Sequence, residues 1–381
     1  MCRLFFCLFL CFVEISVVGQ PKIIINPNSL QTGRLSLNDM VESIEYLPLE
    51  TKVECLLAPV RLFIFSENYM LLNQREGFFL FSRSGRFVAK IGNQGGGPGE
   101  YYRGSMFHID EKNKQVILYE SYRKQLLYYN LQGRFIKSIS YERESLSSFA
   151  NYFINNHLVI KSLNTGHTPY TYTVLDKDYN IIKQQVRPVQ YTMRSGSYSG
   201  KGGWPFCQYV YNNLMHVREN TLNDTLYMIN NDFSFVPKFI INSGRHEVTV
   251  AMRIDGDLFM RELSNLLVLT NLFETKDYLF ISYAFQVESF GYYNKSDSRF
   301  SHFSSSSGIP NDYDGGLDFW PMYQHNNQLI GFVDAYKIKE HKDKSNKLTP
   351  KGSAEAINRF EQMSRKLDAE DNPVMVIVNL K

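Results

Sequence analysis

The stretch Ile91-Gly92-Asn93-Gln94-Gly95-Gly96-Gly97-Pro98-Gly99-Glu100-Tyr101-Tyr102 organises the rest of the chain. Five glycines and one proline fall within eight residues, and a β-like run lies on each side. A phosphate-binding P-loop would need Gly-Lys-Ser/Thr opening a helix. Here Glu100 follows the glycines, and strand-favouring tyrosines follow Glu100. The glycines therefore predict a backbone hinge between two β units, with positive φ angles and close approach of the chain.

Hairpin patterns flank this stretch and repeat along the chain. Residues 78–91 and 126–139 align, and each reads as a strand, a turn carrying Gly-Arg and a second strand. This pattern is typical of a β-hairpin. Weaker copies follow at 172–183, 226–240 and 292–303. The equivalent turn positions are Gly85, Gly133, Tyr179, Phe233 and Asp297, at spacings of 48, 46, 54 and 64 residues.

Another pair of β-like runs precedes each hairpin, for example 61–65 with 69–73. Four strands in each period of about 40–50 residues indicate a β-propeller blade. Five such periods are internal, and a sixth can be assembled from residues 319–323, 328–333, 374–380 and 44–49. The sequence therefore predicts an all-β fold, a single six-bladed propeller with four-stranded antiparallel blades. The N-terminal strand 44–49 would close the ring, so that no blade edge stays unpaired.

Two segments interrupt the repeat. Residues 191–205 are rich in Gly and Ser and predict a long surface loop. Residues 337–372 form an insertion near the C-terminus. Within it, apolar residues recur at helical spacing and predict a helix over about 353–367, which Pro373 ends. The periodic residues are Ile357, Phe360, Met363 and Leu367.

The N-terminus predicts export. Arg3, the apolar run 4–13 and the residues up to Gly19 match a signal peptide of residues 1–19, and the run is too short to span a bilayer. The alternative is a lipid anchor at Cys11, although Leu10 stands where such a signal has a small residue. We expect a periplasmic or cell-surface protein without a transmembrane segment after signal removal. Residues 20–43 would be a lead-in to one domain over 44–381.

The composition supports β-structure and argues against a nucleic-acid partner. The chain has 25 Tyr and 28 Phe against 2 Trp, and Tyr and Phe favour strands. A net charge of +3 is too small for electrostatic binding of nucleic acid. Only Cys55 and Cys207 follow the signal, so disulfides do not hold the fold. We expect both thiols to be unpaired, because they would face each other across the channel, beyond the roughly 7 Å Cα separation that a disulfide spans.

A family resemblance agrees with these patterns. The run from Gly92 to Tyr101 resembles the Gly-x-Gly-Pro-Gly-Glu-Tyr signature of six-bladed β-propeller proteins of the Bacteroidetes cell envelope, relatives of the NHL-repeat propellers. Residues 223–227, 314–316 and 372–374 are similar to further marks of that family. The resemblance covers residues 44–381. It implies fold and export, and it adds little about chemistry.

Aromatic residues stand at the ends of three Gly-rich connections between expected blades. These connections, 92–99, 195–203 and 304–316, should share one face around the channel mouth. Trp204, Trp320 and Tyr101 lie at their ends. We expect the rings to stack on a sugar or another flat ligand. The alternative is that each ring wedges between neighbouring blades as part of the core.

Charged residues accompany the aromatics. Asp312, Asp314 and Asp318 fall in one loop, and several oxygens in a tight loop suit Ca²⁺. The EF-hand pattern fails because Tyr323 stands where it needs Glu, and Asx-turns explain Asp in Gly-rich loops without metal. No other cofactor is expected. Glu100 and Arg103 are the remaining candidates for the mouth, with a surface ion pair as the alternative.

Three functions remain open at this point. The leading hypothesis is non-catalytic binding of a glycan, a peptide or an envelope protein at the loop-rich channel mouth. The alternative is a lyase or hydrolase that uses Asp312, Asp314 and Glu100 as acid/base groups. A purely structural scaffold is the third, since the fold alone does not decide among them.

Overall fold

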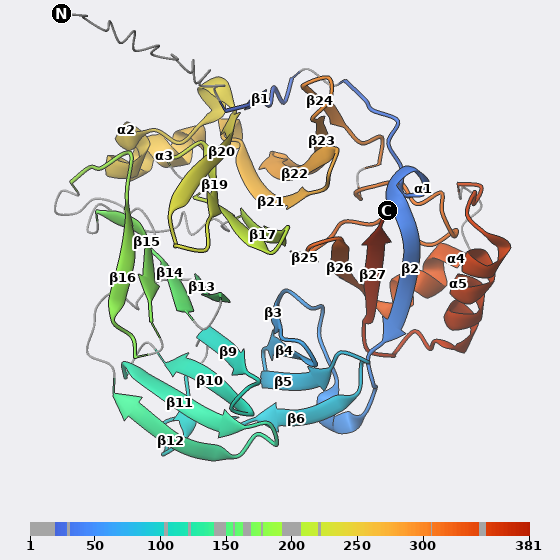
Figure 1. Cartoon of the computed structure of the whole chain (residues 1–381). Helices are drawn as coiled ribbons and strands as arrows, with labels where there is room; N and C mark the ends of the chain where they lie inside the picture. Colours follow the sequence, from blue (N-terminus) through green and yellow to red (C-terminus); the bar gives the residue numbers. More distant parts are fainter. Residues whose placement is uncertain are drawn as a thin grey trace, which may run out of the picture.

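The computed structural model describes residues 20–28, 31–102, 106–120, 123–140, 150–154, 157–162, 169–176, 178–192, 207–219, 222–305, 307–342 and 348–381. The regular secondary structure of these residues is mainly antiparallel β-sheet. The sheets are arranged around a common centre, like the blades of a propeller (Figure 1). The predicted all-β, propeller-like architecture is therefore confirmed.

Four of the sheets are separate and four-stranded, and each is a meander of consecutive strands. Sheet I consists of β3 (Leu62–Phe65), β4 (Tyr69–Gln74), β5 (Gly77–Ser82) and β6 (Phe87–Ile91). Sheet II consists of β9 (Met106–Asp110), β10 (Gln115–Glu120), β11 (Gln125–Asn130) and β12 (Phe135–Ser140). Sheet III consists of β13 (Ala150–Ile154), β14 (His157–Lys161), β15 (Tyr170–Leu175) and β16 (Ile181–Val186). Sheet V consists of β21 (Val268–Glu274), β22 (Tyr278–Phe285), β23 (Val287–Asn294) and β24 (Arg299–His302).

The other large sheet has nine strands in the order β1-β20-β19-β18-β17-β25-β26-β27-β2. One half, sheet IV, consists of β17 (Cys207–Tyr211), β18 (Leu214–Arg218), β19 (Thr225–Ile229) and β20 (Phe235–Asn242). The other half, sheet VI, consists of β25 (Tyr323–His325), β26 (Gln328–Val333), β27 (Val374–Leu380) and β2 (Val41–Pro48). The strand β1 (Lys22–Ile24) lies at the far edge of sheet IV.

The merging of sheets IV and VI differs from the expected ring of six separate blades. Val210 of β17 pairs in parallel with His325 of β25. Beside this bridge, the backbone N–H of Asn213 donates to the side-chain oxygen of Asn326 at 2.8 Å, and the side-chain amide of Asn326 donates to the side-chain oxygen of Asn213 at 2.7 Å. These contacts hold the two inner strands side by side, so four sheets rather than six stand alone.

The core lies between the sheets. One buried apolar cluster joins sheets I and II, a second joins II and III, and a third joins III and IV. The largest cluster contains residues of sheets IV, V and VI, and another joins sheet VI to sheet I. Each sheet is therefore packed against its neighbours in chain order, and the last is packed against the first.

The predicted hairpins are present, and their turns share one backbone geometry. Gly85, Gly133, Tyr179 and Phe233 all have positive φ, between 60° and 83°. In each turn this residue donates its N–H to the carbonyl three residues earlier, as in a type I turn followed by a left-handed residue. The fifth turn places the positive φ at Ser298 rather than at Asp297, so that equivalence was wrong by one residue.

The glycine in the second of these turns is required for two reasons, and this gives a first prediction. Gly133 has φ 79°, and a Cβ on it would lie 2.0 Å from the Lys90 carbonyl oxygen of sheet I. We expect Gly133→Ala to lower the free energy of unfolding by about 2–3 kcal/mol, since strained backbone alone costs about 1–3 kcal/mol. Urea unfolding followed by circular dichroism measures this loss.

Gly244 provides the matched control for this substitution. It has φ 62°, and no atom lies within 4 Å of the position of its missing Cβ. Gly244→Ala therefore introduces the same backbone strain without the clash, and we expect about 1 kcal/mol. Equal losses for the two variants would show that the contact with Lys90 contributes nothing.

Helices are few and lie in connections. They are α1 (Leu37–Met40), α2 (Val250–Ile254), α3 (Gly256–Glu262), α4 (Ala335–Lys342) and α5 (Ala354–Lys366). α5 confirms the predicted helix, since the Ser353 side chain caps its N-terminus and Leu367 ends it. The sequence reasoning missed α2 and α3, which lie between sheets IV and V.

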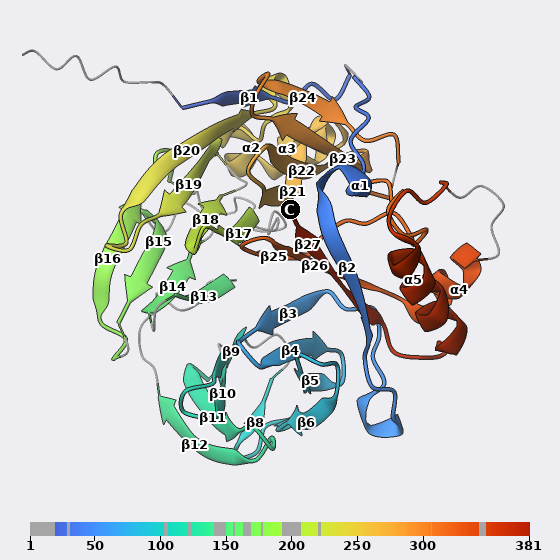
Figure 2. The same cartoon turned by 45° about the vertical axis from the view of Figure 1, so that its right-hand side comes forward.

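The N-terminal segment confirms one expectation and corrects another. β2 pairs with β27 along its length and forms the outer strand of sheet VI, as predicted for the strand at 44–49. The preceding residues are more than a lead-in. β1 adds in parallel to the outer edge of β20, and Thr32 forms a parallel bridge with His302 at the outer edge of β24. We call residues 21–28 and 31–48 the N-terminal belt (Figures 1 and 2).

No disulfide joins the two cysteines after the expected signal, as predicted. Cys55 and Cys207 are both buried. Burial raises the pKa of the Cys207 thiol to about 12 and also raises that of Cys55. Both side chains therefore act as small core residues.

Candidate functional site

The strand directions bring the long connections to one end of the molecule. In a four-stranded meander, the chain leaves the last strand at the same end as the turn between the second and third strands. Hydrogen bonds agree with this placement: Gln94, in a connection, donates to the carbonyl of Arg75, in such a turn, at 2.9 Å. The connections at this loop-rich end include, in their described parts, 49–61, 92–102, 187–192, 243–267, 303–322 and 334–373.

The Gly-rich stretch folds back on itself at the loop-rich end. Its two halves, β7 (Asn93–Gln94) and β8 (Glu100–Tyr101), pair in parallel. The Glu100 carboxylate accepts a hydrogen bond from the N–H of Gly97 at 2.8 Å. A Cβ on Gly95 would lie 2.1 Å from that carboxylate. The glycines thus allow close packing within a self-contained loop, as the hinge interpretation predicted, and Glu100 closes the loop.

Tyr101 is a core residue. Its side chain is 0% exposed and belongs to the buried cluster between sheets I and II. Its hydroxyl donates to the Ile91 carbonyl at 3.0 Å and accepts from the Phe78 N–H at 3.3 Å. Burial raises its pKa to about 12. A ring enclosed in this way cannot stack on a ligand, so the alternative of a wedge between blades is the better description of Tyr101.

The next residue, Tyr102, occupies the exposed position instead. Its ring is 42% exposed, and the Arg123 guanidinium lies 5.1 Å from the ring centroid. Arg123 is itself fixed, because it pairs with Glu120 at 3.1 Å and donates to the carbonyl of Glu100. The Tyr102 hydroxyl lies over Gly96, 3.3 Å from where a Cβ would be. The loop therefore presents one aromatic ring in a defined orientation.

Trp320 also packs as a core ring. It contacts Phe290 with ring centroids 4.8 Å apart and Phe273 at 6.0 Å. Both phenylalanines belong to sheet V. Trp320 packs against the cluster of sheets IV to VI, whereas Tyr101 lies in the cluster of sheets I and II. The structure therefore does not bring these two rings together at one rim.

Two of the three aspartates at 312–318 bind the protein's own N-terminal region, and the third binds within its own loop. Asp312 accepts from the Asn38 N–H at 3.1 Å and from the Lys351 ammonium at 2.8 Å. Asp314 accepts from the Tyr46 hydroxyl at 2.9 Å. Asp318 accepts from the N–H of Asn311 at 3.0 Å. The loop thus fastens α1 and β2, the later part of the N-terminal belt, to sheet VI.

The charges of this loop follow from those contacts. Burial opposes ionisation of Asp312, but hydrogen bonds from Lys351 and neighbouring groups outweigh it and lower the pKa. Burial raises the pKa of Asp314. In the described part of the chain, no three His, Cys, Asp or Glu side chains gather as metal ligands would.

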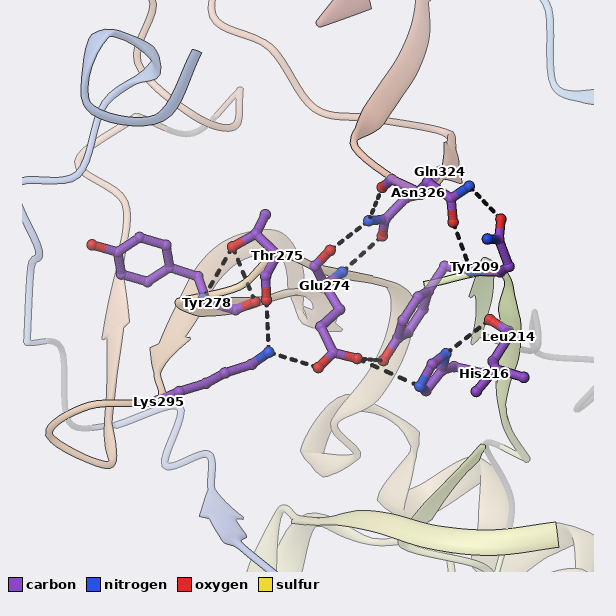
Figure 3. Close-up of polar contacts among 10 residues, drawn as sticks. Tyr209, Leu214, His216, Glu274, Thr275, Tyr278, Lys295, Gln324 and Asn326 are labelled. Atoms are coloured by element: carbon purple, nitrogen blue, oxygen red, sulfur yellow. Dashed lines mark hydrogen bonds and ion pairs between the residues drawn. The ribbon is translucent and has the colours of Figure 1, made fainter. Parts of the chain in front are cut away.

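Glu274 at the end of β21 is the centre of a buried polar network that sequence reasoning missed (Figure 3). Its carboxylate accepts from the Lys295 ammonium at 2.6 Å and from the Tyr209 hydroxyl at 2.9 Å. His216 Nε2 lies 3.7 Å away. The Glu274 N–H donates to the Gln324 side chain at 2.8 Å. One carboxylate thereby connects sheets IV and V, and its backbone connects both to sheet VI.

Burial shifts the pKa values of two side chains in this network. Glu274 is 1% exposed. Burial lowers the pKa of His216, although Glu274 opposes the shift. Burial, with help from Glu274, raises the pKa of Tyr209 well above its usual value. The network lies at the end opposite the loop-rich end, next to the turns that join the first and second strands of each sheet. There it connects neighbouring sheets by hydrogen bonds and ion pairs.

A second buried ionic group lies between sheets III and IV. Arg187 pairs with Glu219, and both are almost fully buried. Thr171 donates to the same carboxylate at 3.3 Å. Lys161 is buried nearby, and burial lowers its pKa well below the usual value. This group faces the loop-rich end but is enclosed by the two sheets that it joins.

The remaining site predictions stay untested by geometry. Trp204 and Arg103 lie outside the described residues. One signal in the sequence could have identified Tyr102, the exposed residue at the loop-rich end that the sequence analysis missed. In a strand, adjacent side chains point to opposite faces, so either Tyr101 or Tyr102 had to face solvent. No comparable local signal exists for Glu274, whose partners come from segments far apart in the chain.

Solved structures of other proteins resemble this fold. Among the described residues, no helix has the length and apolar character needed to cross a membrane. No curated protein matches the sequence. An exported-protein candidate from Bacteroides fragilis NCTC 9343 is similar in structure, with a TM-score of 0.67 at 17% identity over 95% of this chain and 99% of that chain. At this identity the likeness shows a shared fold.

Two further solved structures are less similar. A DUF4221 family member from Bacteroides vulgatus ATCC 8482 has a TM-score of 0.48 at 9% identity, over 90% of this chain and 97% of that one. BamB from Moraxella catarrhalis has a TM-score of 0.36 at 10% identity, over 71% and 68%. The family model of a domain of unknown function, DUF4934, matches residues 22–379. Because this match spans almost the whole chain, the protein belongs to the DUF4934 family.

Proposed function

We propose that this protein is an exported, non-catalytic binding protein whose ligand site is the Tyr102 platform at the loop-rich end. The platform consists of Tyr102, Arg123 and the backbone of Gly96 and Gly97. A ligand with a flat apolar face, such as a sugar ring of an envelope glycan, would stack on the exposed side of Tyr102. Tyr102 takes the place of Tyr101 and Trp320 as the expected stacking residue, because the rings of those two residues pack against the core.

The observation that carries the proposal is the fixed geometry of an exposed aromatic ring. Arg123 is oriented by Glu120 and by loop carbonyls, and its guanidinium covers one side of the Tyr102 ring. A preorganised ring loses little conformational freedom when a ligand binds. An ordinary surface tyrosine would have no such support.

We further propose that the ring has six blades, with sheets IV and VI counted as two of them. The support is that sheets I to VI are each four-stranded and antiparallel, and that β2 completes the last. Residues 1–19 would be the export signal, with anchoring through Cys11 as the alternative. The fold shared with the exported-protein candidate of B. fragilis is consistent with export.

The test compares two exposed tyrosines against a panel of soluble envelope polysaccharides and peptidoglycan fragments. We expect Tyr102→Ala to weaken the tightest interaction about two- to tenfold, since a stacked aromatic contributes about 0.5–1.5 kcal/mol beyond area burial. Biolayer interferometry with immobilised protein measures the affinities. Melting temperatures of the variants establish that they are folded.

Tyr336→Ala is the control. Tyr336 is 45% exposed on α4, and the Lys337 ammonium lies 5.7 Å from its ring centroid. It is therefore a similar cation-covered tyrosine outside the platform, and we expect unchanged affinity. If no glycan binds, or if Tyr102→Ala and Tyr336→Ala behave alike, the platform is not the ligand site.

A further inference from the structure

The outer strands of the sheets differ in whether another strand covers them. The N-terminal belt runs along the outer edges of sheets IV and V before β2 forms the outer strand of sheet VI. Both additions are parallel, and they are hydrogen-bonded: Ile25 N–H donates to the Asn242 carbonyl at 3.0 Å, and Gly33 N–H to the His302 carbonyl at 2.7 Å. The fold thus accepts an added strand at its outer edges.

Sheets II and III have no such cover within the described residues. β12 and β16 are the outermost strands of their sheets, and no described strand pairs with their outer edges. They follow each other along the rim (Figures 1 and 2). Both expose large apolar side chains, each 41–54% exposed: Phe135, Ile136 and Ile139 on β12, and Ile181, Ile182 and Val186 on β16. An apolar, unpaired edge is a template for pairing with another chain.

The charges of these edges indicate what kind of chain would pair. Lys137 is the charged residue of β12 and Lys183 that of β16, and neither strand contains an acid. Pairing with the same edge of a second copy would bring lysines together, and like charges across strands are destabilising. A segment with carboxylates between its apolar residues would instead be attracted.

We propose that the outer edges of β12 and β16 bind an extended acidic and apolar segment of a partner protein by strand addition. The segment would run parallel to β12 and then to β16, as residues 22–25 run along sheet IV and residues 31–33 along sheet V. Main-chain hydrogen bonds would supply affinity, and alternate apolar side chains would supply specificity. This inference does not depend on the Tyr102 platform, which lies at the loop-rich end.

The belt itself supplies the probe for a test. The probe is a fluorescein-labelled peptide with the sequence of residues 21–33 carrying Lys22→Glu, added to the chain that begins at Gln20. That chain's own belt already covers sheets IV and V, so the free edges are those of the other sheets. We expect saturable binding by fluorescence anisotropy. A peptide that also carries Ile23→Pro and Ile25→Pro should not bind, because proline removes the ladder donors.

Variants on exposed positions locate the binding edge. We expect Lys137→Glu to weaken peptide binding about fivefold, and Ile136→Lys with Ile182→Lys to abolish it. Lys238→Glu is the matched control, because Lys238 is exposed on β20, whose edge carries β1, and it should leave binding unchanged. Absence of binding overturns the proposal, as does binding that responds to Lys238→Glu but not to the β12 and β16 variants. A dimer of the free protein that Ile136→Lys dissociates would assign these edges to a second copy instead.

Discussion

A chain that begins at Leu49 is expected not to fold cooperatively, whereas a chain that begins at Thr32 folds with reduced stability. β2 pairs with β27 along the length of sheet VI, and its loss exposes the edge of β27 and the apolar side chains beneath it. Residues 21–31 contribute less. They bury Ile23 and Ile25, and each burial contributes about 1.5–3 kcal/mol, so removing both costs about 3–6 kcal/mol.

Urea unfolding of the two truncated chains, compared with a chain that begins at Gln20, measures these losses. Two point variants separate burial from chain length. Ile23→Ser should reproduce a large part of the loss, whereas Ile24→Ser should not, because Ile24 is 62% exposed on the same strand. Equal stability of all three chains would show that the belt does not hold the ring together.

The repeat was predictable because each hairpin has a local signal. Gly85 and Gly133 mark turns that need a left-handed residue, and the alignment around them locates Tyr179 and Phe233 in the same geometry although neither residue favours it. The helix α5 was predictable for a similar reason, since Ser353 and the apolar spacing that follows it are local features. The first four hairpin turns and α5, which have signals within about a dozen residues, were therefore predicted, whereas the fifth turn was placed one residue early.

Features determined by contacts between distant segments were not predicted from the sequence. The bridge between Val210 and His325 joins two strands that no local pattern relates, and it merges two of the expected blades into one sheet. The burial of Tyr101 could not be predicted for the same reason. A Gly-rich connection with an aromatic at its end describes a core ring as well as an exposed one, and only packing against sheet I distinguishes Tyr101 from Tyr102.

Glu274→Gln is expected to lower the free energy of unfolding by about 3–5 kcal/mol, the cost of breaking a buried ion pair by removing one partner. The carboxylate holds Lys295 at 2.6 Å and Tyr209 at 2.9 Å. The amide keeps the size of the side chain but removes its charge, and the ammonium of Lys295 then lacks its counter-ion. The Tyr209 hydroxyl also loses a charged acceptor, and hydrogen bonds to charged groups are the stronger ones.

Glu361→Gln is the control for the loss of a carboxylate as such. Glu361 pairs with Arg365 one turn later on α5 at 2.8 Å, and both side chains are largely exposed. Exposed pairs of this kind contribute about 0.3–0.5 kcal/mol, so this variant should unfold almost as the parent does.

A double-mutant cycle of Glu274→Gln with Tyr209→Phe then isolates the contact between sheets IV and V. A coupling energy near zero, or equal losses for Glu274→Gln and Glu361→Gln, would mean that packing alone joins the two sheets. A large coupling would show that the hydrogen bond between the Tyr209 hydroxyl and the Glu274 carboxylate holds β17 of sheet IV against β21 of sheet V.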